Sequence, residues 1–339
     1  MKRLLSVLDG KEIRPLPIWL MRQAGRYLPE YREARAKAGS FWSMCMDPSA
    51  AAEVTLQPIR RFGFDAAILF SDILVVPFAM GCDVIFEDGP SLAVINDIRQ
   101  LQCDETVWAR HLAPVYETVK LVRRGLGVDI ALLGFAGAPW TLATYMAEGR
   151  GSSDRRAAKL WGYRAPRSFR DFLDAVADCV AFHLIRQIEA GCDAVQIFDS
   201  WAGDLPARHF GEWVIAPTKR IVKQVRETYP QAKLIGFPRA ATLSGYEAYA
   251  CETGVDGISL DTTVPMEWAM KSLPANIAVQ GNLDPIALLA GGEELRRATD
   301  AIVDAMRGRP LIFNLGHGVV PETPPEHVTE LVEHVRAAR

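Results

Sequence analysis

The stretch IALLGF (130–135), followed by Ala136-Gly137-Ala138-Pro139-Trp140-Thr141, joins a short apolar run to a Gly/Pro-bearing tip that leads into a helical pattern. The same order of strand, tip and helix recurs along the chain, which is typical of parallel β/α units. We expect eight strands, at 17–21, 66–70, 130–135, 194–198, 233–237, 257–260, 277–281 and 311–315. Each run is apolar throughout, as in strands covered on both faces. The pattern predicts a single-domain (β/α)8 TIM barrel over residues 1–339.

Three other segments stand out between these strands. Residues 169–190 carry apolar residues at helical spacing and end at Gly191, which predicts one long helix. Residues 83–97 have the pattern of a hairpin around Asp88-Gly89-Pro90, inserted after the second strand. Residues 149–170 are rich in arginine, so this segment is either a lid over an anionic ligand or a solvated linker before the helix.

Composition excludes several classes of protein. The chain is 49% hydrophobic and 23% charged, as in ordinary globular proteins. Its formal net charge of −3 argues against nucleic acid as a partner, because neutralising phosphates needs clustered lysine and arginine. An anionic ligand must therefore be held by local cations.

Two apolar segments and the cysteines indicate the compartment. Asp9 interrupts the amino-terminal segment 1–14 before a secretory apolar region forms, and Asp72 interrupts the longest apolar stretch, AAILFSDILVVPFAM (66–80). We therefore expect neither export nor a membrane helix. The six cysteines show no CxxC pair and no regular spacing, which favours reduced thiols in a cytoplasmic protein over disulfides or structural zinc.

In a β/α barrel the loops at the carboxyl ends of the strands form the active site, so polar residues directly after the predicted strands are the candidate site residues. They are Arg22, Gln23, Ala24, Gly25 and Arg26 after the first strand, Ser71 and Asp72 after the second, Tyr145 beyond the third, Asp199 and Ser200 after the fourth, and His317 after the eighth. We expect these residues to meet at one mouth.

The chemistry of these side chains leaves alternatives open. Arg22 and Arg26 are either surface arginines or a bidentate clamp for carboxylates or phosphates, with Gly25 allowing close backbone approach. Asp72 is either a helix cap or a carboxylate displayed toward a positive or N–H-rich ligand. His317 between two glycines is either a turn residue or a ligand contact, while Tyr145 and Ser200 are weaker candidates that also suit core or capping positions.

Six segments of the chain closely resemble the uroporphyrinogen decarboxylase family, and they occur in the family's order. They are PIWLMRQAGRYLPEYR (17–32), VTLQPIRRFGFDAAILFSDILVVPFAMG (54–81), GFAGAPWTLATYM (134–146), FDSWAG (198–203), QGNLDP (280–285) and FNLGHG (313–318). The first two are long and unusual, so the resemblance is specific. The chain has no GxxxxGK[ST] or HExxH motif, so neither phosphate-loop chemistry nor a zinc hydrolase is supported.

The resemblance implies a (β/α)8 barrel enzyme, usually a homodimer, that needs neither a metal nor an organic cofactor. It implies decarboxylation of the four acetate side chains of uroporphyrinogen III to give coproporphyrinogen III and carbon dioxide, in porphyrin and haem biosynthesis. The substrate contacts that it implies are Arg22, Gln23, Ala24, Gly25, Arg26, Asp72, Tyr145, Ser200 and His317. Among them Ser200 is the least secure, because related sequences vary there.

The implied reaction fits these residues. Protonating a pyrrole ring makes the electron sink within the substrate itself, and an ionised Asp72 would stabilise the resulting cation. Arg22 and Arg26 would hold the acidic side chains. The catalytic set is therefore Asp72, Arg22, Arg26 and Tyr145, with the proton donor unassigned, because an arginine pKa lies far from that of an efficient general acid and Tyr145 or a substrate carboxyl is an alternative.

Two other functions compete with this one. A barrel methyltransferase of the same superfamily would bind zinc through a His-x-Cys arrangement, and no histidine here has a cysteine two residues on. A non-catalytic tetrapyrrole carrier would share the arginine clamp but would not need a carboxylate aimed at the ring centre. Product formation separates the carrier from the enzyme.

Overall fold

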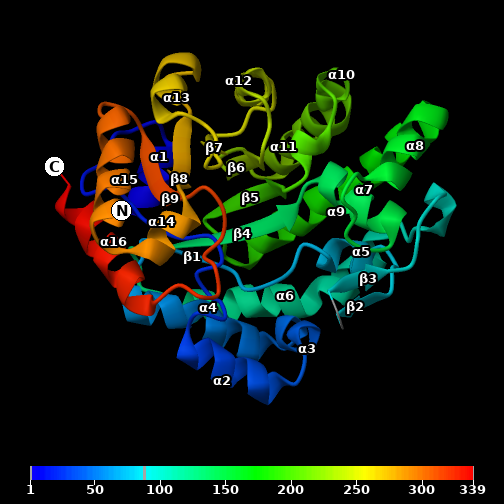
Figure 1. Ribbon diagram of the computed structural model, residues 1–339. Helices are drawn as coiled ribbons and strands as arrows, with labels where there is room; N and C mark the ends of the chain where they lie inside the picture. Colours follow the sequence, from blue (N-terminus) through cyan, green and yellow to red (C-terminus); the bar gives the residue numbers. More distant parts are fainter. Residues whose placement is uncertain (1, 87–88, 339) are drawn as a thin grey trace.

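The computed structural model describes residues 2–86 and 89–338, and its centre is a seven-stranded parallel sheet with helices packed outside it (Figure 1). The strands run in the order β1-β4-β5-β6-β7-β8-β9. They are β1 (Ala66–Ile68), β4 (Ala131–Gly137), β5 (Ala194–Asp199), β6 (Lys233–Pro238), β7 (Gly257–Ser259), β8 (Ala278–Leu283) and β9 (Leu311–Leu315). Seven of the eight predicted strands are thus confirmed, each paired in parallel with its neighbour.

The remaining predicted strand, 17–21, forms no regular strand and makes one parallel bridge, between Ile18 and Phe313 of β9. The amide of Phe313 donates to the carbonyl of Pro17 at 2.9 Å, and the amide of Asp65 donates to the carbonyl of Ile18 at 3.0 Å. The segment therefore lies between β9 and the start of β1. A full ladder cannot form at its beginning because Pro17 has no N–H to donate.

The sheet curls so that strands distant in its order touch on the concave side. The side-chain amide of Gln280 on β8 donates to Gln196 on β5 at 3.1 Å and to Ser259 on β7 at 3.1 Å. The indole N–H of Trp19 donates to the Gln280 oxygen at 3.0 Å. Because two strands separate β5 from β8, this buried network requires strong curvature, and it ties segment 17–21 to the same interior.

Most helices cover the convex side of the sheet and fill the connections between strands, whereas α1 (Arg3–Leu8) packs into the concave side. The helices are α1 (Arg3–Leu8), α2 (Pro29–Ala38), α3 (Phe41–Met46), α4 (Pro48–Phe62), α5 (Val75–Ala79), α6 (Glu105–Gly125), α7 (Pro139–Glu148), α8 (Arg156–Arg164), α9 (Pro166–Ala190), α10 (Ala207–Phe210), α11 (Ala216–Thr228), α12 (Leu243–Glu252), α13 (Met266–Ser272), α14 (Pro285–Ala290), α15 (Gly292–Ala305) and α16 (Pro325–Ala337), with short turns at Ile98–Gln100, Ala202–Asp204 and Gly211–Ile215. The predicted helix 169–190 is α9, which begins three residues earlier because Pro166 suits the first turn. None of the helices in the described part of the chain combines the length and the apolar character that a bilayer crossing requires.

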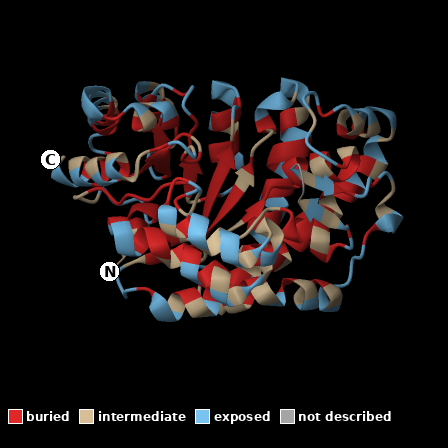
Figure 2. Ribbon diagram, turned by 60° about the horizontal axis from the view of Figure 1, so that its bottom comes forward, coloured by how far each residue is buried: buried red, intermediate tan, exposed pale blue. Residues whose placement is uncertain are grey.

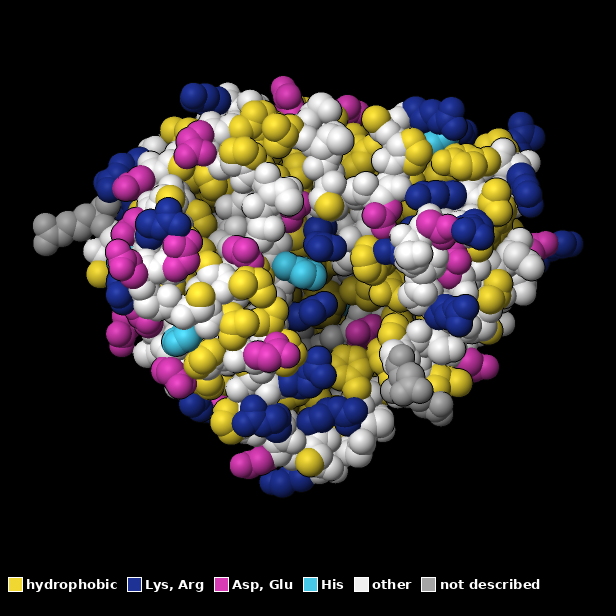
Figure 3. Space-filling view, viewed as in Figure 1, with side chains coloured by type: hydrophobic (Ala, Val, Ile, Leu, Met, Phe, Trp, Pro, Cys, Tyr) yellow, Lys and Arg dark blue, Asp and Glu magenta, His cyan; other side chains and the backbone are white. Residues whose placement is uncertain are grey.

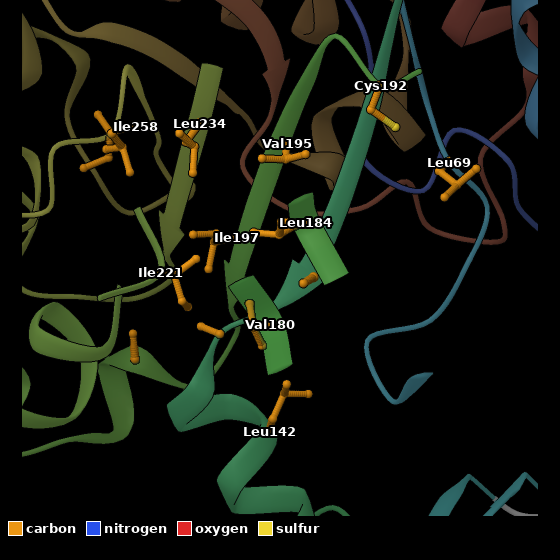
Figure 4. Packing of buried hydrophobic residues seen from close by; sticks show 14 of the residues in the cluster. Leu69, Leu142, Val180, Leu184, Cys192, Val195, Ile197, Ile221, Leu234 and Ile258 are labelled. Carbon is orange, nitrogen blue, oxygen red and sulfur yellow. The ribbon is translucent and has the colours of Figure 1, made fainter. Parts of the chain in front are cut away.

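The core has two layers, one on each face of the curled sheet. The larger layer lies between the sheet and the helices, where Leu184 of α9 sits beside Ile197 of β5 (Figure 4). The smaller layer fills the concave side, where Leu4 of α1 joins Leu133 and Ile312 of the strands. Both faces of the strands are therefore buried (Figure 2), which explains why the strand sequences are apolar throughout.

The hairpin and the basic segment lie together near one end of α7. Strands β2 (Val84–Phe86) and β3 (Pro90–Leu92) pair antiparallel, so the hairpin is confirmed, while Asp88 of its expected turn lies outside the described residues. An isolated bridge joins Ser91 of the hairpin to Arg150. Residues 149–170 include α8, and many of them are exposed, so the segment before the long helix α9 has the solvent exposure of the expected linker but contains a helix of its own.

Candidate active site

A cavity of about 550 Å³ opens at the carboxyl ends of the strands, within the size range of small-molecule sites. All nine contact residues expected from the sequence line it, namely Arg22, Gln23, Ala24, Gly25, Arg26, Asp72, Tyr145, Ser200 and His317. Figure 3 shows this hollow at the centre of one face, with basic side chains and a histidine gathered around it. The tips of different strands thus converge on one mouth.

The arginines of the first tip have an unusual backbone and no ion-pair partner. Arg22 adopts a φ of 60°, a conformation that non-glycine residues rarely take. A Cβ at Gly25 would lie 3.0 Å from the Arg22 carbonyl oxygen, so this tight turn favours glycine. In the described part of the chain, no carboxylate lies within 4.0 Å of the guanidinium of Arg22 or Arg26. Two guanidiniums therefore line the cavity without a direct ion pair, although the charge of Asp72 acts on Arg22 from a longer distance.

Asp72 is the carboxylate of the cavity and is partly buried. One of its oxygens accepts the amide of Leu74 at 2.8 Å, in a turn that leads into α5. Burial raises the pKa of Asp72 to about 6, although the Leu74 hydrogen bond and the charge of Arg22 pull the pKa down. The capping and the displayed-carboxylate interpretations are thus both partly met, because the side chain bonds a local amide and also faces the cavity.

Tyr145, Ser200 and His317 reach the cavity from three different elements. Tyr145 lies on α7, and burial followed by the charge of Asp72 raises the pKa of its phenol, so the group stays protonated. Burial, together with the charges of Arg22 and Arg239, lowers the pKa of His317 to about 4, so the imidazole is neutral near pH 7. Ser200 directly follows β5 and is half-buried.

The glycines beside His317 serve close packing within the protein. A Cβ at Gly318 would lie 2.3 Å from the Cδ atom of Arg22, and a Cβ at Gly316 would lie 2.5 Å from the amide of Thr262. Gly318 makes room for the Arg22 side chain.

Gln23 and Asp199 are buried groups with unused hydrogen-bonding capacity. The Gln23 side chain lines the cavity, and neither its oxygen nor its nitrogen has a partner among the described residues. Asp199 turns away from the cavity, where its carboxylate accepts the Thr141 hydroxyl at 2.5 Å. Burial raises the pKa of Asp199 to about 7. The Gln23 amide is thus buried and unpaired beside the cavity, while Asp199 fixes the Thr141 hydroxyl, which in turn accepts the amide of Trp201 at 3.2 Å.

An aromatic floor lies under the charged residues, and the sequence analysis did not identify it as part of the site. Phe70, Phe135, Phe198 and Phe237 all line the cavity, and each is the last residue of a predicted strand. The rings of Phe135 and Phe198 meet edge to face at 5.6 Å between centroids, and those of Phe198 and Phe237 at 6.1 Å. The shared position at the strand ends was a signal from which this floor could have been found.

Arg239 is a second omission. It lines the cavity directly after β6, and the rule that polar residues after strands are candidates would have selected it. None of the described residues of the basic segment 149–170 lines the cavity. Arg155 of that segment is buried, pairs with Asp204 at 3.1 Å and stacks over Trp201 at 3.8 Å. The segment therefore packs, through Arg155, against Trp201 in the wall of the cavity.

The cavity has few donors suited to a metal ion. His317 and Asp72 are its one histidine and one carboxylate among the described residues. Across residues 2–86 and 89–338, no group of three or more His, Cys, Asp or Glu side chains is placed to hold a metal. All six cysteines are free.

Comparisons with known proteins agree over the full length of the chain. Residues 1–338 match the family model described as uroporphyrinogen decarboxylase (URO-D). A uroporphyrinogen decarboxylase from Chelativorans sp. is 53% identical over 342 residues, covering 100% of this chain and 99% of the relative. One from Brucella canis is 52% identical over 346 residues, with the same coverage.

Among solved structures, a methyltransferase from Methanosarcina mazei matches with a TM-score of 0.82 at 20% identity, covering 98% of this chain and 97% of that one. A B12-independent methionine synthase from Shewanella matches with a TM-score of 0.56 at 12% identity, covering 85% of this chain and 87% of that one. At these identities the likeness concerns the fold.

Proposed function

The chain belongs to the uroporphyrinogen decarboxylase family, and we propose that it converts uroporphyrinogen III to coproporphyrinogen III, releasing carbon dioxide from four acetate side chains in porphyrin and haem biosynthesis. The observation that carries this function is the composition of the cavity. A single carboxylate, Asp72, lies in it together with phenylalanine rings and with arginines that form no ion pair. A porphyrinogen has the complementary chemistry, with anionic side chains at its edge and pyrrole N–H groups at its centre.

Each part of the ligand has a counterpart in the cavity. The peripheral carboxylates suit the guanidiniums of Arg22 and Arg26, because a planar fork binds a carboxylate with two hydrogen bonds. The carbon skeleton of the pyrroles suits the phenylalanine floor. The inner N–H groups suit the oxygens of Asp72. A carboxylate that accepts several N–H donors also regains a low pKa, so binding itself would ionise Asp72.

The reaction then needs little more than electrostatics. After a pyrrole ring is protonated, the bond between the acetate CH2 and its carboxylate breaks, carbon dioxide leaves, and the electron pair neutralises the ring cation. A proton delivered to the exocyclic CH2 gives the methyl group and restores the ring cation, and the ring then loses the proton that it gained in the first step. Each carbon dioxide released therefore consumes one proton in all. Asp72 stabilises the cationic ring, the charge that develops before carbon dioxide leaves. Tyr145 is protonated and faces the same cavity, so Tyr145 and a substrate carboxyl remain the two candidate proton sources.

Assembly, boundaries and location belong to the same proposal. We propose one catalytic domain over residues 1–339, supported by a family match over residues 1–338. We propose that segment 17–21 closes the curled sheet by taking the place of the eighth strand of a barrel. Its hydrogen bonds to Phe313 and Asp65 support this proposal. We also propose that the protein acts as a homodimer in the cytoplasm and needs no cofactor, membrane or nucleic acid. The family resemblance and the composition of the chain support this part of the proposal.

The decisive test is anaerobic incubation of the protein with uroporphyrinogen III, followed by oxidation and separation of the porphyrins by carboxyl number. We expect the eight-carboxyl species to disappear through seven-, six- and five-carboxyl species to the four-carboxyl product. Binding without any loss of carboxyl groups would identify a carrier instead. A parallel sample treated with chelator should keep its turnover, whereas stoichiometric metal whose removal abolishes turnover and whose return restores it would revive a methyltransferase-like chemistry.

A further inference from the structure

Arg239 is a charged residue of the cavity to which neither the sequence motifs nor the family resemblance assigns a role. It directly follows β6, and its half-buried side chain lines the cavity together with Arg22 and His317. Its guanidinium lies within 3.5 Å of the carbonyl oxygen of Ser200, a long and weak contact. Across residues 2–86 and 89–338, no carboxylate lies within 4.0 Å of it. It is therefore a third arginine at the mouth that forms no ion pair.

The backbone of Arg239 is held from two sides. Its amide donates to the carbonyl of Asp199 at 3.1 Å and to that of Phe237 at 3.0 Å, and its carbonyl accepts the amide of Gly203 at 3.1 Å. The loop after β5 fits here because residue 203 is glycine, since a Cβ at Gly203 would lie 2.1 Å from the carbonyl oxygen of Ala240. The side chain thus starts from a fixed point at the cavity wall.

Asp261 holds the next residue, Ala240, in a strained conformation. Ala240 has a φ of 60°, and its amide donates to an Asp261 oxygen at 2.6 Å. The same carboxylate accepts the Tyr246 hydroxyl at 2.7 Å, and its other oxygen accepts the amide of Thr263 at 2.8 Å and its hydroxyl at 2.6 Å. Burial raises the pKa of Asp261, but these hydrogen bonds outweigh burial and keep the pKa below the usual range, so the carboxylate is ionised.

The charge of Arg239 reaches the other cations of the site. It contributes to lowering the pKa of Arg22 and that of His317, after burial as the main cause. Like charges held together in a cavity cost free energy, and an anion between them removes that cost. A ligand with several carboxylates is the class of molecule that could neutralise three separate guanidiniums.

Resting on the proposed function, we propose that Arg239 is a third cationic contact for the carboxylate side chains of the substrate, and that Asp261 is the positioning residue that holds it at the cavity through Ala240.

The first test compares Arg239→Met with Arg239→Lys and with a control, Arg124→Met. Arg124 is exposed at the end of α6, before β4 begins, and so lies at the opposite end of the sheet. A contact made equally to bound substrate and transition state raises KM and spares kcat. We expect Arg239→Met to raise KM for uroporphyrinogen III about tenfold or more. The lysine variant should fall in between, and the control should match the parent.

A binding measurement with uroporphyrin, the oxidised eight-carboxyl compound, checks the same contact without turnover. We expect its Kd to rise with KM in Arg239→Met. A folded Arg239→Met variant with parental KM and Kd would overturn the proposal, and Arg239→Gln offers a second truncation if the methionine variant does not fold. Failure of the parent itself to decarboxylate uroporphyrinogen would contradict the proposed function, so the two failures are distinguishable.

The second test is a double-mutant cycle between Asp261 and Arg239. Asp261→Asn replaces one hydrogen-bond acceptor with a donor and loosens the Ala240 turn. We expect it to raise KM in the parent and to add little in the Arg239→Met background, because both changes remove the same contact. Equal KM effects in both backgrounds would show that Asp261 acts on the fold generally and would overturn its positioning role.

Discussion

The two ends of the curled sheet carry similar charged residues, but these residues are paired with opposite charges at one end and mostly unpaired at the other. At the amino end, Asp193 precedes β5, pairs with Lys2 and with Arg123, and accepts the amide of Leu132 at 2.7 Å. Asp256 precedes β7 and does the same with Arg226 at 3.0 Å and the amide of Leu234 at 2.9 Å. These carboxylates are tied both to cations and to the edge of the sheet.

At the carboxyl end the charges that line the cavity lack such partners. In the described part of the chain, Arg22, Arg26 and Arg239 have no ion pair, and Asp72 accepts one backbone amide. Charge pairing at one end stabilises the fold, whereas unpaired charge at the other end is available to a ligand. Hydrogen-bonding completeness, more than residue type, therefore separates structural charges from functional ones.

The largest effect on activity is expected for Asp72→Asn. The substitution keeps the shape of the side chain but removes the charge that opposes the cationic ring. We expect kcat to fall about 100- to 1,000-fold, as for loss of one preorganised electrostatic group in other enzymes, while circular dichroism and the melting temperature show a folded protein. Near-parental turnover by the folded variant would contradict the stabilising role of Asp72.

The pH dependence of activity and of stability tests the role of Asp72 in a second way. Because the pKa of Asp72 is raised to about 6, we expect kcat/KM to fall about tenfold per pH unit below pH 6, where the carboxyl is protonated. Folding stability should change in the opposite direction, since a raised folded pKa favours the native state at low pH and that contribution is lost as pH rises through about 6.

Asp72→Asn is the control for this profile. The acidic break in kcat/KM should disappear in the residual activity of that variant. Asp199, whose pKa burial raises to about 7, is the other carboxyl near the mouth that titrates in this region. If the break persists in Asp72→Asn, the titrating group is a different one, and the profile would then point to Asp199.

A smaller effect is expected when the clamp arginines keep their charge but lose their shape. Arg22→Lys and Arg26→Lys replace a bidentate fork with a point charge, so we expect each to lower kcat/KM for uroporphyrinogen III by roughly tenfold. The positive φ of Arg22 is unchanged by this substitution, so folding should be unaffected. Parental kcat/KM in both lysine variants would show that charge alone is sufficient at these positions.

The smallest effect on activity is expected at the amino end of the sheet. Asp193→Ala removes two cation contacts and the acceptor of the Leu132 amide, so we expect unfolding by denaturant to show a loss of about 1–3 kcal/mol in stability. At a temperature well below the melting point, kcat/KM should stay parental. A marked change of KM in a folded Asp193→Ala would break the separation between the two ends.

Much of the fold was readable from the sequence because the strands are buried on both faces. Apolar runs such as IALLGF (130–135) and LIFNL (311–315) have one stable location, between two apolar layers, and both form strands. Segment 17–21 has the same composition but makes only one bridge. The difference depends on Pro17 and on the space between β9 and β1. The size of that space cannot be read from the composition of the segment.

The candidate site was partly readable for a geometric reason. Parallel strands end at one edge of a sheet, so residues after them, such as Arg22, Asp72 and His317, were predicted to meet, and the structure brings them to one cavity. The phenylalanine floor and Arg239 were omitted. A phenylalanine at a strand end is apolar like the strand itself, and only its position at the rim of the curled sheet turns it into a ligand surface.

Seven strands, their order along the chain and the polar residues that follow them were readable from the sequence, because an uninterrupted apolar run and the direction of the chain are local properties. Which charges are neutralised depends on how the chain folds. Asp193 and Asp72 look alike as isolated acidic residues beside apolar runs, yet one meets two cations from distant parts of the chain and the other faces an open cavity. Pairing depends on residues far apart in sequence that the curvature of the sheet brings together, and no local pattern encodes that distance.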